Sequence, residues 1–181
     1  MLHRTQAIQV LMVYERFMEF YPDLQALNQA SKEQLYDLLQ SIGLNWRIDL
    51  IPKMAHELIV RFDGHIPHDK TALLSLPGVS SYIASAVRCF TWNLPETLID
   101  TNTTRVIGRL FGLEIKDSSR RNPIFRESLA KPVDPDKPKI YTYALLDLAN
   151  QICTKRKPPN CSSCPVLHHC LYGINALGEG V

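Results

Sequence analysis

The stretch "LLSLPGVSSYIASAV", Leu73 to Val87, has the pattern of two short helices that meet at a tight turn. A Pro-Gly pair marks the turn, because glycine tolerates a left-handed backbone that other residues rarely adopt. Leu76 and Val79 flank the pair and are expected to pack together across it. The second helix is expected from Ser80, and the N–H groups at its start would attract an anion such as a DNA phosphate. An ordinary helical hairpin without a ligand explains the same residues.

The rest of the chain also has helical patterns. Apolar residues recur at helical spacing over 7–20, and Ser31 and Gly43 are the expected ends of the next helix. Further helices are expected over these ranges: 48–62, 101–113 with Gly112 near its end, 122–131 and 139–153. No stretch alternates as a strand would, and no internal repeat is present. The sequence therefore predicts an all-α protein.

The bulk composition indicates a globular protein. The chain has 181 residues, of which 45% are hydrophobic and 21% charged. Neither a membrane-spanning run nor the apolar core of a signal peptide is seen, so we expect a reducing cytoplasm. The net charge of +2 does not by itself imply a polyanionic partner, but basic residues gather at 120–121 and 155–157.

Four of the five cysteines lie in one short loop near the C-terminus. Their spacing is C-x7-C-x2-C-x5-C, and they are Cys153, Cys161, Cys164 and Cys170. Thiols this close together in a reducing compartment indicate a metal site rather than disulfides. Zinc and a 4Fe–4S cluster both take four thiolates, and the spacing alone leaves both open. Unpaired structural thiols are the third alternative.

Together these motifs resemble the helix–hairpin–helix DNA glycosylases of the endonuclease III and MutY type. The family's hairpin reads LPGVG-x-x-T/I-A, and residues 76–84 read "LPGVSSYIA", with Ser80 in place of the second glycine. The family's catalytic aspartate begins a helix in V/I/L-D-x-N/H-x-x-R-V, which corresponds to "LIDTNTTRV" at 98–106. With the cysteine loop as the third motif, the resemblance extends from Leu2 to Cys170.

The resemblance implies that Asp100 is the catalytic aspartate and that Tyr82, 18 positions earlier, faces it. Base removal passes through an oxocarbenium-like transition state that a carboxylate can stabilise, after the target base has left the helical stack. As a residue type, Asp100 is also a good helix N-cap. Relatives that also cleave the strand carry a lysine at the position of Tyr82, and its amine forms a Schiff base. Since tyrosine cannot do so, we expect a monofunctional glycosylase without strong lyase activity at the abasic site.

The resemblance also implies a 4Fe–4S cluster on Cys153, Cys161, Cys164 and Cys170, although the family's first gap is one residue shorter. The implied architecture is a helical bundle domain with the helix–hairpin–helix at 21–131 and a small iron–sulfur loop domain at 132–181. A cleft is expected between them, with the N-terminal helix at 1–20 on the cluster side. The DNA contacts that we expect are Leu76, Gly78, Ser80, Ser81, Arg4, Gln6, Arg47, Lys155 and Arg156.

The function that follows is excision of a mispaired base, thymine or uracil opposite guanine, from double-stranded DNA in base excision repair. The expected protein is a monomer, associated with the nucleoid and not with a membrane. Adenine glycosylases of the MutY type can also have tyrosine at the position of Tyr82, so an adenine glycosylase is the alternative enzyme. A further C-terminal domain is usual in those enzymes, and we expect none after "LYGINALGEGV", which favours the thymine or uracil reading.

A third alternative is a non-catalytic iron–sulfur module that binds DNA. Family members have a segment before the position of Met1, and in the MutY type it supplies a catalytic glutamate. Three explanations follow: the natural start lies upstream of Met1, the enzyme works without that glutamate, or the protein is impaired.

Overall fold

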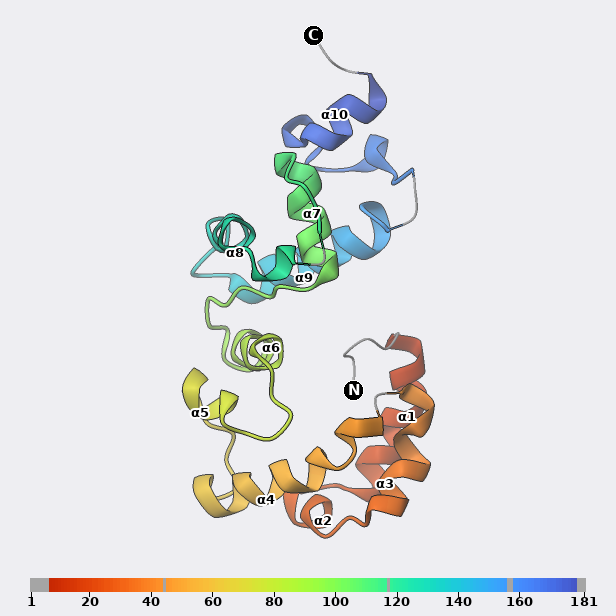
Figure 1. Cartoon of the computed structure of the whole chain (residues 1–181), viewed down its shortest axis with the longest axis vertical. Helices are drawn as coiled ribbons and strands as arrows, with labels where there is room; N and C mark the ends of the chain where they lie inside the picture. Colours follow the sequence, from red (N-terminus) through yellow and green to blue (C-terminus); the bar gives the residue numbers. More distant parts are fainter. Residues whose placement is uncertain (1–6, 44, 117, 156–157, 179–181) are drawn as a thin grey trace. The chain divides into compact units, whose positions relative to one another are not determined.

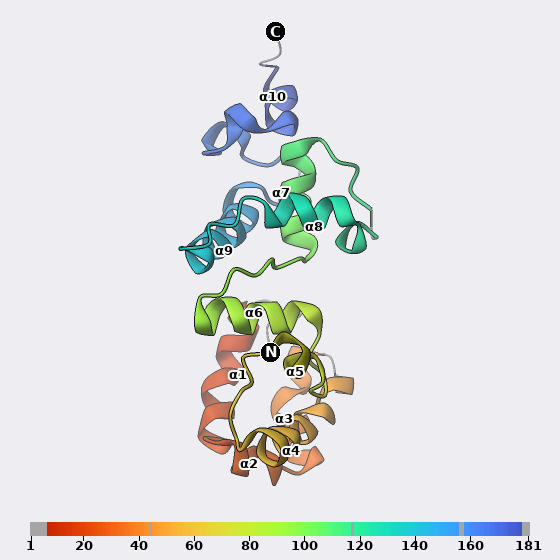
Figure 2. The same ribbon diagram turned by 90° about the vertical axis from the view of Figure 1, so that its left-hand side faces the viewer.

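The computed structural model describes residues 7–43, 45–116, 118–155 and 158–178, and every regular element in these ranges is helical (Figure 1 and Figure 2). The prediction of a helical protein is thereby confirmed for the described residues. The chain forms two compact units, with the division between Ser80 and Ser81. The predicted domain boundaries and the cleft between the domains stay predictions.

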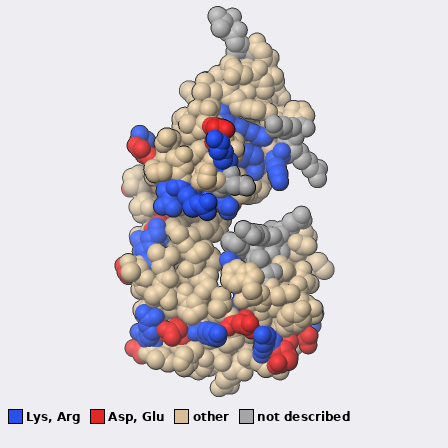
Figure 3. Space-filling view, viewed as in Figure 1, with Lys and Arg blue, Asp and Glu red and all other residues tan. Residues whose placement is uncertain are grey.

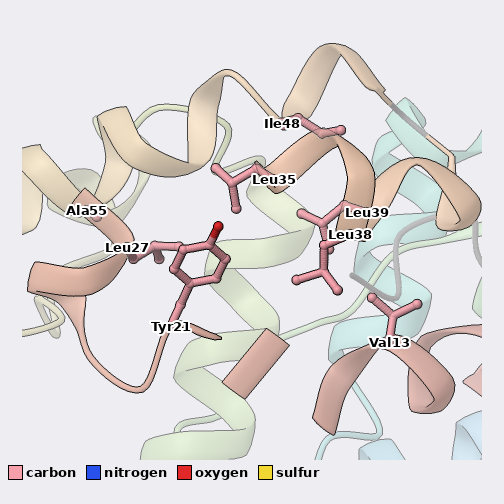
Figure 4. Packing of buried hydrophobic residues seen from close by; sticks show 8 residues of the cluster. All are labelled: Val13, Tyr21, Leu27, Leu35, Leu38, Leu39, Ile48 and Ala55. Atoms are coloured by element: carbon pink, nitrogen blue, oxygen red, sulfur yellow. The ribbon is translucent and has the colours of Figure 1, made fainter. Parts of the chain in front are cut away.

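The first unit packs its helices around one apolar core. Its elements are α1 (Ala7–Phe20), α2 (Leu24–Asn28), α3 (Lys32–Leu39), α4 (Leu50–Phe62) and α5 (Lys70–Leu74), with 3-10 turns at Gln40–Ile42 and Asn45–Arg47. Figure 4 shows the core side chains pointing toward one another from α1, α2, α3 and α4 and from the segments between them. They are Val13, Tyr21, Leu27, Leu35, Leu38, Leu39, Ile48 and Ala55. Burial of these side chains is the main contribution to the stability of this unit.

Local signals in the sequence set the helix ends of the first unit. Ser31 forms the expected cap, because its hydroxyl accepts from the N–H of Gln34 and the Gln34 side chain accepts from the Ser31 N–H. Gly43 ends the following 3-10 turn at a φ of 74°, as expected of a terminating glycine. The short helix α2 was not predicted, although Asp23 caps it by accepting from the N–H of Ala26.

The second unit consists of α6 (Ser81–Trp92), α7 (Thr101–Phe111), α8 (Pro123–Ala130), α9 (Pro138–Asp147) and α10 (Leu171–Leu177). A π-helical segment, Leu148–Ile152, continues α9, and three 3-10 turns complete the unit: Ser119–Arg121, Cys161–Ser163 and Leu167–His169. Gly112 ends α7 in the left-handed conformation, as predicted. The prediction did not include α10, which packs against α7.

The apolar core of the second unit is smaller than that of the first. Ile107 of α7 packs with Phe125 and Leu129 of α8, and partly buried side chains surround them. The helix that begins at Asp100 is therefore held from one side by α8. No helix within the described ranges is long and apolar enough to cross a membrane.

We expect Leu129→Ala to lower the free energy of unfolding of the second unit by about 2–5 kcal/mol, because Leu129 is 1% exposed and its removal leaves a cavity. The matched control is Ile124→Ala on the same helix, where the side chain is 57% exposed and the change should stay within about 0.5 kcal/mol. Urea unfolding followed by circular dichroism measures both. Equal costs for the two variants would contradict the packing described here.

Candidate active site and cysteine loop

Asp100 caps α7, and its two carboxylate oxygens are in different situations. Oδ1 accepts from the backbone N–H groups of Asn102 and Thr103, both at 2.8 Å. Oδ2 has one long contact, 3.4 Å, from the side-chain amide of Asn102. Two backbone donors orient the carboxylate firmly, since this is the charge-assisted form of N-cap bonding. Oδ2 is therefore the carboxylate oxygen that can still accept further hydrogen bonds.

Two buried threonines fix the backbone of Asp100. The N–H of Asp100 donates to Oγ1 of Thr103 at 3.0 Å, and Oγ1 of Thr104 donates to the carbonyl of Asp100. Thr103 and Thr104 are both fully enclosed. A side chain that starts from so constrained a backbone has little freedom to move, so the direction of the carboxylate is set by the first turn of α7.

Tyr82 and Asp100 lie close enough in the second unit for their charges to interact. Tyr82 is in the first turn of α6 and is half-buried. Burial raises the pKa of the Tyr82 hydroxyl, and the negative charge of Asp100 raises it further. The structure thus brings together the two residues that the sequence motifs single out, with the phenol in its neutral form at physiological pH.

Arg105 links the cap of α7 to the start of the cysteine loop. Its Nη1 donates to Oδ1 of Asn102 at 3.0 Å, and its Nε donates to the carbonyl of Cys153 at 2.9 Å. Nη2 donates at 2.9 Å to the carbonyl of Ala149, inside the π-helical segment. One guanidinium therefore holds Asn102, which touches Asp100, and the chain around the first loop cysteine.

The four loop cysteines face one small cavity. Cys153, Cys161, Cys164 and Cys170 all line it, and none is in a disulfide. Burial raises the pKa of Cys161, and the nearby Cys170, Cys153 and Cys164 raise it further. Burial also raises the pKa of Cys164; a backbone hydrogen bond at Val166 lowers it, and Cys170 and Cys153 raise it. Ionised thiols this close together repel one another, so a nearby positive charge, such as that of a metal centre, would stabilise their thiolate forms.

Donors reach two of these sulfurs from the protein. Nη1 of Arg109 lies 3.3 Å from Sγ of Cys153, and the backbone N–H of Gly173 lies 3.4 Å from Sγ of Cys170. A side chain at Gly173 would begin 2.8 Å from Leu167 and 3.6 Å from the Cys170 sulfur, so the loop closes tightly over the cysteines. Both features fit the thiolates of an iron–sulfur cluster, whose sulfurs accept hydrogen bonds.

Within the described residues, no three side chains of His, Cys, Asp or Glu are placed so that they could hold one metal ion. His168 and His169, next to Cys170, are both exposed.

An open pocket of about 790 Å³ lies beside the cysteine loop, between α7 and α10. Its charged lining residues are Arg105, Arg109 and Lys155, and no Asp or Glu is among the described residues that line it. The guanidinium of Arg109 also stacks over the ring of Tyr172 at 5.0 Å. Lys155, predicted to contact DNA, is thus exposed at the edge of a positively charged surface.

The hairpin residues predicted to contact DNA divide into buried and exposed ones. Leu76 is 4% exposed, and its carbonyl accepts from the N–H of Val79 across the turn. Its side chain therefore stabilises the turn. Gly78 is exposed at a φ of 79°, a conformation that requires glycine, and Ser81 is exposed at the start of α6. Ser80 is partly buried. DNA contacts from this turn stay predictions.

The remaining predicted contacts are placed in part. Arg47 lies in the 3-10 turn Asn45–Arg47, and its guanidinium stacks over Trp46 at 4.9 Å. Trp46 is 60% exposed, so its ring lies outside the core of the first unit. Arg4, Gln6 and Arg156 lie outside the described residues.

Sequence reasoning missed the connecting residues Asn102, Arg105 and Arg109. Arg105 stands inside the motif that marks Asp100, so a signal was present, but its partners are some 44–48 positions away in the sequence. Arg109 follows one helical turn later on the same face of α7. The spacing of four residues between the two arginines could have indicated that they share a helix face, but not which carbonyls they bind.

Comparison with known proteins gives one consistent result. The sequence profile of the HhH-GPD superfamily base excision DNA repair protein matches residues 1–132. A thymine/uracil-DNA glycosylase from Pyrobaculum aerophilum is 39% identical over 179 residues, which cover 95% of this chain and 76% of that protein. A thymine-DNA glycosylase from Aeropyrum pernix is 36% identical, with coverages of 97% and 80%. An adenine DNA glycosylase from Mus musculus is 31% identical but is covered over only 33% of its length.

Solved structures agree with the sequence matches. The structure of a thermostable thymine-DNA glycosylase superposes with a TM-score of 0.86 at 28% identity, covering 96% of this chain and 80% of that one. A trapped covalent intermediate of endonuclease III with DNA gives a TM-score of 0.84 at 27% identity, with coverages of 97% and 81%.

We expect Asp100→Asn to lower the pKa of Tyr82. The substitution removes the negative charge that opposes ionisation of the phenol, and asparagine still caps the helix. An alkaline titration followed by tyrosinate absorbance measures the shift, with Tyr82→Phe to identify the signal of that tyrosine. The pKa should stay above the ordinary value, because burial, the larger cause, remains. An unchanged pKa would show that the two side chains do not interact.

Proposed function

This chain belongs to the HhH-GPD superfamily of base excision DNA repair proteins, and we propose that it excises thymine or uracil opposite guanine from double-stranded DNA. The observation that carries the chemistry is the carboxylate of Asp100, fixed as the cap of α7 beside Tyr82. The choice of base is supported by relatives: three proteins named as thymine or thymine/uracil glycosylases match at 39%, 36% and 29% identity over most of their length. The adenine glycosylases match at 27–31% over half of theirs or less.

Asp100 acts through the oxygen that the helix cap leaves available. As the bond from sugar to base breaks, positive charge grows on the sugar, and a fixed carboxylate beside it stabilises the transition state more than the ground state. Oδ1 is occupied by two N–H groups, so Oδ2 is the atom that faces this charge or orients the attacking water. The target base must be out of the stack for the sugar to reach this oxygen.

Tyr82 makes the enzyme monofunctional. Its phenol is neutral, since burial and Asp100 both raise its pKa, and it has no amine with which to form a Schiff base. The product is an abasic site in an uncut strand. The aromatic ring packs against the displaced nucleotide.

DNA binds through the basic second unit. From Ser81 onward the chain has thirteen Lys and Arg and nine Asp and Glu, whereas the first eighty residues have seven and nine. Figure 3 shows Lys and Arg gathered on the visible face of the second unit with few acidic side chains among them, while on the first unit the two signs alternate. Phosphate contacts with such a surface supply most of the affinity, independently of sequence. In this proposal the protein is a monomer that associates with chromosomal DNA.

Cys153, Cys161, Cys164 and Cys170 hold a 4Fe–4S cluster. The cavity that all four thiols line, the hydrogen bonds to two sulfurs and the close fit at Gly173 support it. When bound, the cluster ties a loop with few helical residues into a fixed shape. The residues of α7 that touch this loop, Arg105 and Arg109, gain a rigid partner.

The substrate prediction is tested with a panel of labelled duplexes that contain T:G, U:G, A:G or A opposite oxidised guanine. Purified protein should release the base from T:G and U:G only, and the strand should break only after treatment with alkali. Release from the adenine duplexes alone would favour the adenine glycosylase. If no duplex reacts while the protein carries its full complement of iron, the chain is a binding module.

In Asp100→Asn we expect the single-turnover rate of base release to fall by at least about a hundredfold, since a charge that acts in the transition state is lost. The affinity for the same duplex should change little, because it comes mainly from phosphate contacts. Quenched reactions give the rate, and fluorescence anisotropy gives the dissociation constant. A variant that keeps the wild-type rate would leave Asp100 as a helix cap only.

Tyr82→Lys should create a lyase. An amine at this position can attack the sugar carbon from which the base has left, and borohydride then traps a covalent adduct between protein and DNA. The wild type and Tyr82→Phe are the controls, and neither should give an adduct on a denaturing gel. An adduct with the wild type would contradict the monofunctional assignment.

Protein purified without oxygen should be brown and contain about four irons per chain, as expected of a 4Fe–4S cluster. Cys161→Ser should lose most of this iron, whereas Cys89→Ser, outside the loop, should retain it. Iron analysis and visible absorption measure both variants. One zinc per chain in a colourless protein would overturn the cluster assignment.

A further inference from the structure

A buried carboxylate, Glu96, lies in the segment that joins α6 to α7. Its side chain accepts hydrogen bonds from α6: Oγ of Ser85 donates to Oε2 at 2.9 Å, and Nε of Arg88 donates to Oε1. Glu96 is 8% exposed and Ser85 is enclosed as well. A buried charge is stable only when it is paired and hydrogen-bonded, so these contacts hold Glu96 in one position.

This carboxylate lies between the two proposed active-site residues in the covalent structure. Ser85 is one helical turn after Tyr82 on α6, on the same side of the helix. Glu96 is four residues before Asp100. The Ser85–Glu96–Arg88 bridge, meaning these three side chains and their two bonds, therefore fastens the helix that carries Tyr82 to the segment that carries Asp100.

The segment itself has no regular backbone structure that could do this. Residues 93–99 are neither helix nor strand. The segment is fixed at its start, where the N–H of Leu94 donates to the carbonyl of Arg88, and at its end, where Asp100 caps α7. Leu98 is buried, but an apolar contact is non-directional and does not by itself fix the course of the backbone. Asn93 adds side-chain bonds to Lys139 and Asp136 at the start of the segment, and the directional bonds to Glu96 hold the chain nearer to Asp100.

We propose that the Ser85–Glu96–Arg88 bridge sets the separation of Tyr82 and Asp100, and that Glu96 is a positioning residue for base excision. The proposal rests on the proposed function for its effect on rate. Glu96 touches no reacting atom. Its contribution is geometric: a displacement of about 1 Å between reacting groups can cost a hundredfold in rate.

The decisive variant is Glu96→Gln, which keeps the size of the side chain and the bond to Ser85 but removes the charge that pairs with Arg88. On a T:G duplex at saturating protein, we expect the single-turnover rate to fall about tenfold, while the dissociation constant for the duplex stays within about twofold. The matched control is Glu127→Gln, which removes an exposed ion pair with Lys131 on α8 and should leave the rate unchanged.

A second variant keeps the test open if Glu96→Gln does not fold. Ser85→Ala removes only the 2.9 Å bond to Oε2 and leaves the ion pair intact. A smaller loss of rate in the same direction is expected, with circular dichroism identical to that of the wild type. A stabilising role alone would change the unfolding midpoint of these variants and leave the rate of the folded protein unchanged, and that result would overturn the proposal.

The titration of Tyr82 gives a readout that does not depend on activity. If the bridge holds Asp100 beside Tyr82, Glu96→Gln should lower the pKa of Tyr82 toward its ordinary value, and Glu127→Gln should not. A lower rate with an unchanged Tyr82 pKa would contradict a positioning role. If the wild type itself releases no base from any duplex, the proposed function fails. A lowered pKa of Tyr82 in Glu96→Gln would even then show that the bridge sets the separation of Tyr82 and Asp100.

Discussion

The bonding of one carboxylate to the first turn of a helix determines how the rest of the second unit must be built. Asp100 accepts two backbone N–H groups through Oδ1, so its second oxygen points in a direction that α7 dictates. That direction is useful only if α7 itself does not move. α8 packs on it from one side, and Arg105 and Arg109 tie it to the cysteine loop. A helix cap normally acts only within its own helix. Here the contacts around α7 also keep the capping carboxylate in one orientation.

The two units are stabilised in different ways. Among the described residues, the buried polar and charged side chains are Ser85, Glu96, Thr103, Thr104, Arg109, Ser119 and Thr142, and all of them belong to the second unit. The buried core cluster of the first unit is apolar except for the hydroxyl of Tyr21. Apolar packing tolerates substitutions that conserve volume, whereas a buried polar network loses much when one partner is removed. The unit that carries Asp100 therefore accepts less sequence variation for a given stability.

Features of the fold that depend on residues close together in the sequence could be predicted, whereas contacts between distant residues could not. Helix ends at Ser31, Gly43 and Gly112 followed from single residues, because caps and terminators act within one turn. The grouping of four thiols followed from their spacing. The contacts of Arg105 and Glu96 did not, since each joins residues that only the folded chain brings together. The short helix α10 was missed because the cysteine-rich stretch before it has no helical periodicity.

Asn93 shows how two demands can meet at one position. It ends α6 with a φ of 53°, a left-handed conformation that asparagine and glycine tolerate best. Its side chain also accepts from the N–H of Lys139 at 3.3 Å and donates to the carbonyl of Asp136 at 3.4 Å, across the start of α9. Glycine would satisfy the backbone but offer neither bond, and aspartate could accept but not donate. In a library of variants at this position, asparagine should be the residue that selection recovers, because no other natural side chain combines that backbone tolerance with a donor and an acceptor on one short stem.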